Sequence, residues 1–138
     1  MKIKYWIKAA RLRTLPLALS SILMGGALAF INNFKVSLPI ILLAITTTLL
    51  LQILSNFAND YGDGIKGTDK NRTNSDRMVQ SGKISSRQML FTIIITSFLT
   101  FFIGAFLLLK VFGLQNLMYF SIFLIIGILA IIAAIKYT

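Results

Sequence analysis

The acidic residues of this chain are few and lie close together. There are four carboxylate side chains, Asp60, Asp63, Asp69 and Asp76, and no Glu. All four fall within 17 consecutive residues of a 138-residue chain. Carboxylates spaced three apart at the end of a helix, as Asp60 and Asp63 are, can share a divalent cation, and Mg²⁺ is usually held by one or two carboxylates with water and substrate phosphates. The spacing therefore favours a Mg²⁺ site.

Amides precede these carboxylates and cations follow them. The amides are those of Gln52, Asn56 and Asn59. The cations are those of Lys66, Lys70, Arg72 and Arg77. Lys and Arg side chains can neutralise phosphate charge beside a metal ion. The segment as a whole predicts a Mg²⁺–diphosphate site. The alternative interpretation, a solvated loop that only signals membrane topology, explains the cations but leaves the clustering of all acids unexplained.

The amino acids that are absent exclude several kinds of chemistry. The chain has no Cys and no His. This excludes disulfides, thiol nucleophiles, histidine-ligated metals and catalytic triads. The lack of Glu also argues against an EF-hand, whose loop is closed by that residue.

Four uncharged windows indicate the elements that must position this site. They cover residues 14–34, 36–59, 88–109 and 111–135 and hold 21, 24, 22 and 25 residues, and about 20 suffice to cross the hydrocarbon core as a helix. Apolar residues make up 57% of the chain and charged residues 13%. We predict an all-α, polytopic membrane protein with one domain, 1–138, four transmembrane helices and a site loop over residues 60–87.

Local signals predict how these helices begin and where the second one ends. Thr14 can cap the first helix, and Ser85 with Ser86 can cap the third. Gly62, Gly64 and Gly67 predict that the second helix gives way to the loop near residue 60. If that helix continued instead, one polar stripe would form, which should face the bundle interior or a water-filled cavity. Its members would be Gln52, Asn56, Asn59 or Asp60, and Asp63.

The placement of positive charge predicts the orientation. Of 14 Lys and Arg residues, 12 lie in the N-terminal segment, in residues 60–87 or at Lys136, and only Lys35 and Lys110 lie on the other side. Under the positive-inside rule both termini and the site loop should face the cytoplasm. The same rule accounts for the net charge of +10 without a nucleic-acid partner. Membrane lipid is the expected surrounding.

The motif around the acids resembles that of the UbiA-type intramembrane prenyltransferases. Their Asn-Asp-x-x-Asp motif is matched by residues 59–63. The branch that acts on 1,4-dihydroxy-2-naphthoate in menaquinone synthesis is the most similar, since its extended pattern is matched at Gly67, Asp69, Arg72, Arg77 and Ser81-Gly82. The N-terminal run 11–16 also looks like that branch's entry to its first span. Asn74-Ser75 departs from the usual Gly-Pro, and Leu12 stands where Pro is common.

The resemblance implies a reaction and a role for each site residue. A polyprenyl group would pass from polyprenyl diphosphate to an aromatic acceptor, 1,4-dihydroxy-2-naphthoate, giving demethylmenaquinone at a bacterial cytoplasmic (inner) membrane. The catalytic carboxylates would be Asp60 and Asp63. Mg²⁺ would be held by Asn59, Asp60, Asp63 and Asp69. The diphosphate would be bound by Asn56, Asn59, Lys66, Arg72 and Arg77.

Length is the largest departure from that family. Its members have about twice as many residues and a second aspartate-rich loop, so the resemblance implies the front half of the bundle, a truncated chain, and a C-terminal half or a second copy as partner. A non-catalytic membrane assembly or interaction subunit is the main alternative. A CDP-alcohol phosphotransferase is a lesser one, because its Asp-x-x-Asp-Gly motif is matched at residues 60–64 but not beyond.

Overall fold

The computed structural model describes residues 2–32, 34, 37–66 and 77–136. Its helices are α1 (Ile3–Ala10), the short 3₁₀ turn η1 (Leu12–Thr14), α2 (Leu15–Ile31), α3 (Leu38–Lys66), α4 (Ser86–Phe112) and α5 (Leu117–Lys136). No strand occurs in the described part of the chain. The prediction of an all-helical fold is confirmed.

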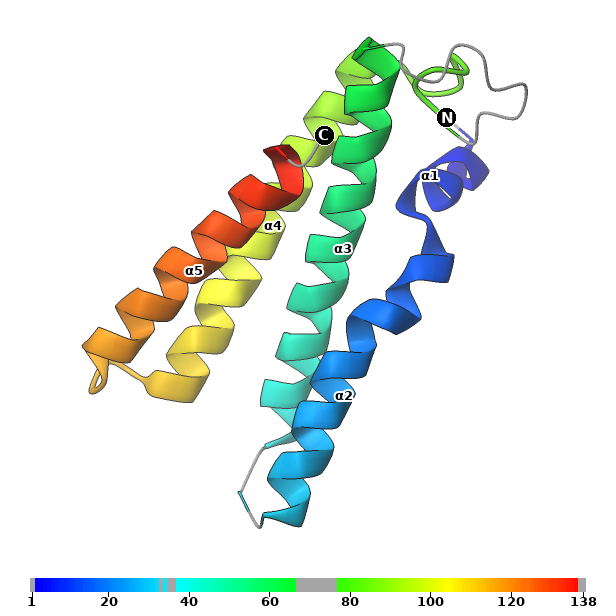
Figure 1. Ribbon diagram of the computed structural model, residues 1–138. Helices are drawn as coiled ribbons and strands as arrows, with labels where there is room; N and C mark the ends of the chain where they lie inside the picture. The colour runs from blue at the N-terminus through cyan, green and yellow to red at the C-terminus, as the bar shows by residue number, and fades with distance from the viewer. Residues whose placement is uncertain (1, 33, 35–36, 67–76, 137–138) are drawn as a thin grey trace.

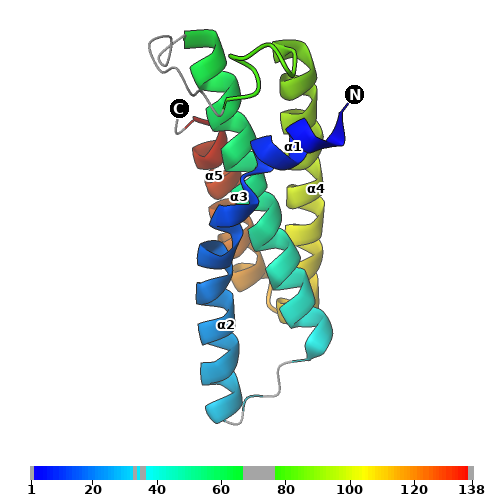
Figure 2. The same cartoon turned by 90° about the vertical axis from the view of Figure 1, so that its right-hand side faces the viewer.

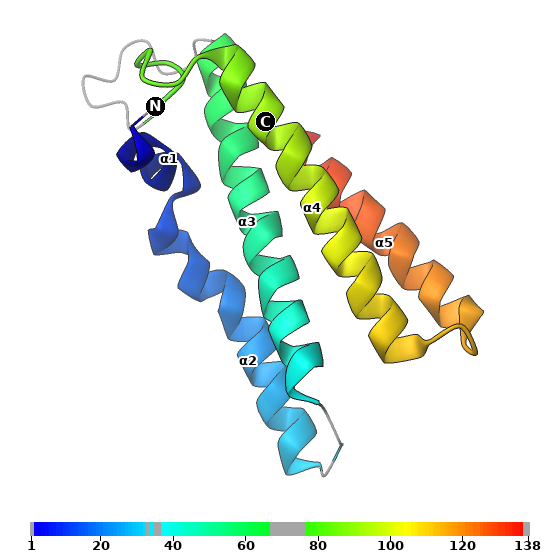
Figure 3. The same ribbon diagram turned by 180° about the vertical axis from the view of Figure 1, so that it is seen from behind.

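Helix α3 is the centre of the bundle. It packs against α2 on one side and against α4 and α5 on the other, and α1 contacts it near its C-terminal end (Figures 1 and 3). The end of α3, the start of α4, the end of α5 and α1 all lie toward the same end of the bundle. Groups from four helices are thereby brought near the acidic motif.

The helices are long and apolar enough to cross a membrane. The described residues contain four such stretches, Ile3–Ile31, Leu38–Lys66, Ser86–Phe112 and Leu117–Lys136. Large apolar side chains point outward, with Leu17 80% and Phe30 83% exposed. Such side chains are favourable against lipid and costly against water. The chain is therefore a multi-pass membrane protein.

Helix α3 is longer than the sequence indicated. The loop was expected to begin at residue 60, but the helix continues through Gly62 and Gly64 to Lys66. A glycine costs a helix only about 1 kcal/mol relative to Ala, and contacts made by this last part of α3 with residues 77–79 offset that cost. Asp60 and Asp63 are consequently on a helix rather than in a loop.

A short helix that the sequence did not indicate precedes the first span. Helix α1 lies across the bundle rather than along it, as Figure 2 shows. It is separated from α2 by Arg11, whose backbone is left-handed with φ 50° and ψ 58°. This conformation is uncommon for a residue with a side chain and turns the chain from α1 into η1.

The two predicted helix caps have different outcomes. Ser85 caps α4 as expected, in a capping box in which its hydroxyl accepts from the Gln88 N–H at 3.2 Å and the Gln88 side chain accepts from the Ser85 N–H. The prediction for Thr14 is wrong, because its side chain does not cap α2. Thr14 is helical itself, since η1 runs directly into α2, and its hydroxyl donates to the Arg11 carbonyl at 2.9 Å.

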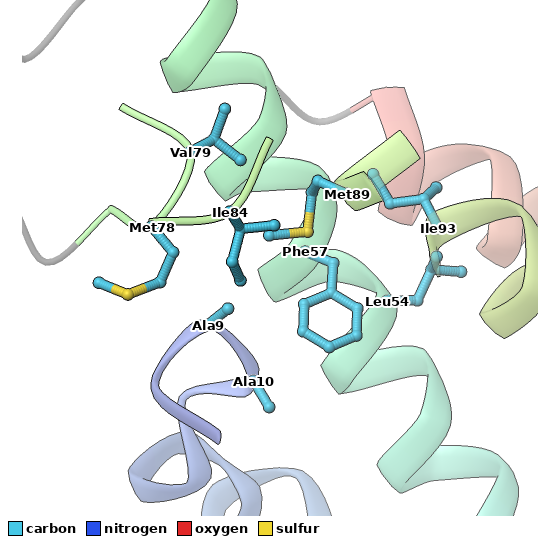
Figure 4. Packing of buried hydrophobic residues seen from close by; sticks show 9 residues of the cluster. All are labelled: Ala9, Ala10, Leu54, Phe57, Met78, Val79, Ile84, Met89 and Ile93. Atoms are coloured by element: carbon cyan, nitrogen blue, oxygen red, sulfur yellow. The ribbon is translucent and has the colours of Figure 1, made fainter. Parts of the chain in front are cut away.

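The buried core lies at the same end of the bundle as the acidic motif. It contains Ala9 and Ala10 of α1, Leu54 and Phe57 of α3, Met78, Val79 and Ile84 of the segment before α4, and Met89 and Ile93 of α4 (Figure 4). Trp6 packs against this core and meets the Phe57 ring edge-on, with centroids 5.9 Å apart. The site end is thus the best packed part of the described chain.

Candidate active site

Asp60 is buried at the junction between α3 and the segment that leads into α4. Its Oδ2 accepts a hydrogen bond from the backbone N–H of Met78 and its Oδ1 one from the N–H of Val79, both at 2.9 Å. Only 2% of the residue is exposed. A buried carboxylate is tolerated when charge-assisted hydrogen bonds replace its water. The carboxylate therefore holds residues 78 and 79 against α3.

Asp63 lies one turn further along α3 and is more accessible. Its Oδ2 forms an ion pair with Nη2 of Arg77, the residue just before the two amides that Asp60 accepts from. The side chains of Arg77 and Asp63 are 18% and 16% exposed. The structure thus brings together a carboxylate and a cation that the sequence had placed 14 residues apart.

Arg11 adds a second cation that the sequence analysis did not assign to the site. Its guanidinium is close enough to Arg77, Asp60 and Asp63 to interact electrostatically with each of them. Arg11 also lines a pocket of about 270 Å³ with Ile7, Lys8, Leu12 and Arg13. By sequence alone, Arg11 counts only toward the positive charge of the N-terminal segment. The hint in the sequence was that it begins the run 11–16 that looks like the family's entry to the first span.

Asn56 is buried and directed toward the N-terminal segment. Its Nδ2 donates to the Ala10 carbonyl at 2.8 Å and to the Thr14 hydroxyl at 3.2 Å. Gln52, one turn earlier, donates to the same hydroxyl at 3.4 Å. The polar stripe that a continuing helix would form is therefore present. Its first half binds the N-terminal segment and its second half the segment before α4.

The other predicted site residues are only partly placed. Asn59 and Lys66 lie in the last two turns of α3, where Asn59 is half-buried and Lys66 is exposed. Asp69 and Arg72, for which we predicted metal and diphosphate contacts, lie outside the described residues, as does Asp76. The described part of the candidate site thus comprises Asn59, Asp63 and Lys66 on α3, with Arg77 paired to Asp63 and Arg11 within electrostatic range.

The donor set fits a hard divalent cation shared with a phosphate ligand. Asn59 and Asp63 are four residues apart, so their side chains lie on neighbouring turns of one helix face. One carboxylate and one amide oxygen are suitable protein ligands for Mg²⁺ when phosphates and water complete its coordination. Among the described residues no group of three or more acidic, His or Cys side chains could hold a metal ion. Phosphate oxygens and water can complete the coordination that Asn59 and Asp63 begin.

An apolar pocket lies deeper in the bundle. It has a volume of about 120 Å³ between α3, α4 and α5, and its lining includes Leu51, Gly104, Phe123 and Gly127. Leu51 precedes Asn59 by eight residues, which corresponds to about 12 Å along a helix.

Comparison with known proteins identifies similar sequences along this chain. Residues 18–138 match the UbiA prenyltransferase family. The chain is 43% identical over 141 residues to a 1,4-dihydroxy-2-naphthoate octaprenyltransferase of Haemophilus influenzae, covering 99% of this chain and 44% of that protein. It is 46% identical over 134 residues to the Escherichia coli protein of the same name, covering 96% of this chain and 42% of that protein.

A more distant relative has the same name. The protein from Mycobacterium tuberculosis is 37% identical over 86 residues, which are 62% of this chain and 29% of that protein. No solved structure matches. The chain spans less than half the length of the curated relatives it matches. The long apolar helices, the Asn59–Asp63 motif and the family match over residues 18–138 agree with one another. The chain belongs to the UbiA prenyltransferase family.

Proposed function

We propose that this protein takes part in transferring a polyprenyl group from polyprenyl diphosphate to an aromatic acceptor, 1,4-dihydroxy-2-naphthoate. The observation that carries the proposal is the pairing of Asp63 with Arg77, with Arg11 close by, at one end of an apolar bundle in this family. The names of the relatives support the prenyl and naphthoate specificities. Because the chain spans under half of those relatives, the proposal concerns this chain's part in the reaction.

The diphosphate would bind at the end of α3. Asn59 and Asp63 would hold Mg²⁺, together with Asp69, and the ion would supply positive charge to the diphosphate oxygens. The guanidinium of Arg77 and the ammonium of Lys66 would contact the same oxygens, with Arg72. The Nδ2 donors of Asn56 are already used by Ala10 and Thr14. We therefore place its contribution in holding the N-terminal segment, and with it Arg11, beside the site.

These cations would lower the barrier to ionisation. The allylic C–O bond breaks and the diphosphate leaves with the electron pair, so negative charge grows on oxygens that face Arg77 and Arg11. Groups already oriented toward growing charge stabilise the transition state more than the ground state. The acceptor's ring carbon that carries the carboxylate then forms the new C–C bond to the allylic cation. The bond to the carboxylate breaks, CO₂ leaves, and the electron pair of that bond restores the aromatic ring.

The apolar part of the bundle would hold the prenyl chain. From a diphosphate at Asn59 the chain could run toward the pocket that Leu51 and Gly104 line. Burial of each CH₂ contributes about 0.8 kcal/mol, so a long prenyl chain adds binding affinity. The diphosphate, held at the end of α3, determines where the reacting allylic carbon lies. Outward-facing apolar side chains such as Leu17 leave the bundle sides compatible with lipid.

Binding of a non-hydrolysable polyprenyl diphosphate analogue to the purified chain tests this proposal. We expect binding that requires Mg²⁺ and weakens about tenfold or more in Asp63→Asn and in Arg77→Gln, because each loses a charge-assisted contact. Lys110→Gln is the matched control, since Lys110 lies at the opposite end of α4 and its change should leave the Kd within about twofold.

The alternative, a non-catalytic assembly subunit, predicts a different result. It gives the Asp63 carboxylate no ligand to hold. Binding that is indifferent to Mg²⁺, Asp63 and Arg77, or no binding at all, would therefore contradict the proposed function and favour that alternative.

A further inference from the structure

Residues 77–79 dock on the last turns of α3 through three successive contacts. Arg77 pairs with Asp63, the amides of Met78 and Val79 donate to Asp60, and the Val79 side chain lies over Gly64. Positions 60, 63 and 64 share one face of a helix because they are three and four residues apart. The motif therefore presents a single surface to this short segment.

The contact at Asp60 needs a carboxylate. Each of its two oxygens accepts from a different backbone N–H, those of Met78 and Val79, at 2.9 Å. An Asn side chain offers one oxygen and one NH₂ group, so one of the two N–H groups would face a donor. Met78 is itself fully buried. An N–H left unpaired there could not hydrogen-bond to water instead, because the site is buried.

The contact at Gly64 needs the absence of a side chain. A Cβ built on Gly64 would lie 2.5 Å from Val79 Cγ1 and 2.8 Å from Val79 Cβ. Both distances are far below van der Waals contact, and Val79 is buried with its branched side chain against α3. A methyl group at position 64 would therefore push the segment away from the helix.

We infer that Asp60 is a positioning residue, which holds the backbone at residues 78–79 so that the Arg77 guanidinium lies at Asp63. The inference deepens the proposed function and rests on it for the role of Arg77. It departs from the expectation that Asp60 is a catalytic residue and a metal ligand. Both carboxylate oxygens are engaged by amides and the residue is 2% exposed, whereas Asp63 is the more accessible acid.

This assignment divides the Asn59–Asp63 motif into two functions. Asp63 and Asn59 present oxygens to a cation and its phosphate ligand. Asp60 places the cationic side chain that meets the same phosphate. Loss of either acid would reduce turnover, but for different physical reasons, so activity alone does not separate a ligand from a positioning group.

Amide hydrogen exchange of the full chain in detergent micelles separates them. We expect Asp60→Asn to speed exchange of the peptide containing Met78 and Val79 by about tenfold, because two charge-assisted bonds are lost. A peptide from the buried face of α4 around Ile93 should be unchanged. Asp63→Asn should leave the amides of Met78 and Val79 protected. Unchanged exchange of those amides in Asp60→Asn would overturn the inference.

Metal binding without diphosphate gives the second readout. Mn²⁺, which prefers the same oxygen ligands as Mg²⁺, can be followed by its EPR signal. Asp60→Asn should keep the Mn²⁺ affinity within about twofold of the original chain, while Asp63→Asn should lose about tenfold or more. Equal loss in both variants would show that Asp60 is a ligand and would overturn the inference. If the original chain binds no Mn²⁺, the proposed metal site fails, and the exchange result alone decides the role of Asp60.

Gly64→Ala keeps the inference testable if Asp60→Asn does not fold. It displaces the same segment and leaves every carboxylate in place, so it should also speed exchange at Met78 and Val79. Gly104→Ala is the matched control, because its Cβ would meet Thr47 Cγ2 at an ordinary 3.5 Å. Equal exchange at residues 78–79 in these two glycine variants would contradict the docking on which the inference depends.

Discussion

Asn56, a residue of α3, donates a hydrogen bond to the C-terminal end of α1. Its Nδ2 donates to the carbonyl of Ala10, the last residue of α1. The last four carbonyls of any helix lack partners within it, and here the left-handed Arg11 turns the chain away immediately afterwards. A buried amide of α3 thus supplies a donor that the N-terminal segment cannot supply to itself.

Replacing Asn56 should therefore destabilise the fold. Asn56→Leu keeps the approximate size but leaves the Ala10 carbonyl without its buried donor, at a cost of about 1–3 kcal/mol in the free energy of unfolding. An SDS titration followed by circular dichroism measures it. Thr46→Ala is the control, because the Thr46 hydroxyl bonds only within its own helix, to the Leu42 carbonyl, and should change stability by less than about 0.5 kcal/mol. Equal effects of the two changes would contradict this role.

The roles of Asn56 and Asp60 could not be predicted from the sequence. Residue types and spacing indicated a polar site, and the structure pairs two of the residues predicted for it, Asp63 and Arg77. Asn56 bonds to the Thr14 hydroxyl and to the backbone carbonyl of Ala10, 46 residues away. Asp60 accepts from the backbone N–H of Met78, 18 residues away. Every residue has such backbone groups, so no side-chain pattern marks them.

At the scale of elements, helix α4 depends on how it begins. Ser85 accepts from the Gln88 N–H and the Gln88 side chain accepts from the Ser85 N–H. This box stands directly after the segment that carries Arg77. The cap fixes the first turn of α4, and with it the point at which the segment carrying Arg77 joins that helix.

Removing the cap should loosen the start of α4 measurably. Ser85→Ala should lower the free energy of unfolding by about 1 kcal/mol, because the first-turn N–H groups lose their acceptor. The same SDS titration reports it. Ser86→Ala, one residue later and inside the helix, is the matched control and should have a smaller effect; a larger effect at Ser86 would contradict the capping assignment.

The uncharged windows predicted the four long helices. They did not predict where α3 ends or that α1 exists. Glycines at 62 and 64 predicted the end of the helix near residue 60, whereas α3 runs to Lys66. Local propensity was overridden by a tertiary contact, since Gly64 provides the space for Val79. Helix α1 was missed because its Lys residues were interpreted only as a topology signal. In the structure its Ala9 and Ala10 belong to the core.

At the scale of the whole molecule, packing is unevenly distributed. The buried core lies at the end of the bundle that carries the acids, while no residue of α2 or α5 is buried in the described chain. The positive charges are also unevenly distributed along the bundle. Most lie toward the core end, as Lys83 does, whereas Lys110 lies in the last turn of α4 at the opposite end. We propose that the core end faces the cytoplasm.

Single introduced cysteines test this orientation. The chain has no cysteine of its own, so no other residue reacts with a thiol reagent. In intact bacterial cells a membrane-impermeant maleimide should label Lys110→Cys, and it should label Lys83→Cys only after permeabilisation, because the more positive side is retained inside. Both lysines are exposed, so the label can reach each site. The reverse pattern would contradict the proposed orientation.

The single tryptophan gives this molecule an intrinsic optical probe. Trp6 is the chain's one indole, and its ring meets Phe57 beside the core that also contains Met78 and Val79. The emission of an indole depends on the polarity around it. Undocking of residues 77–79, or separation of α1 from α3, would change that polarity. Undocking of residues 77–79, as expected in Gly64→Ala, can therefore be followed by fluorescence in the unlabelled protein.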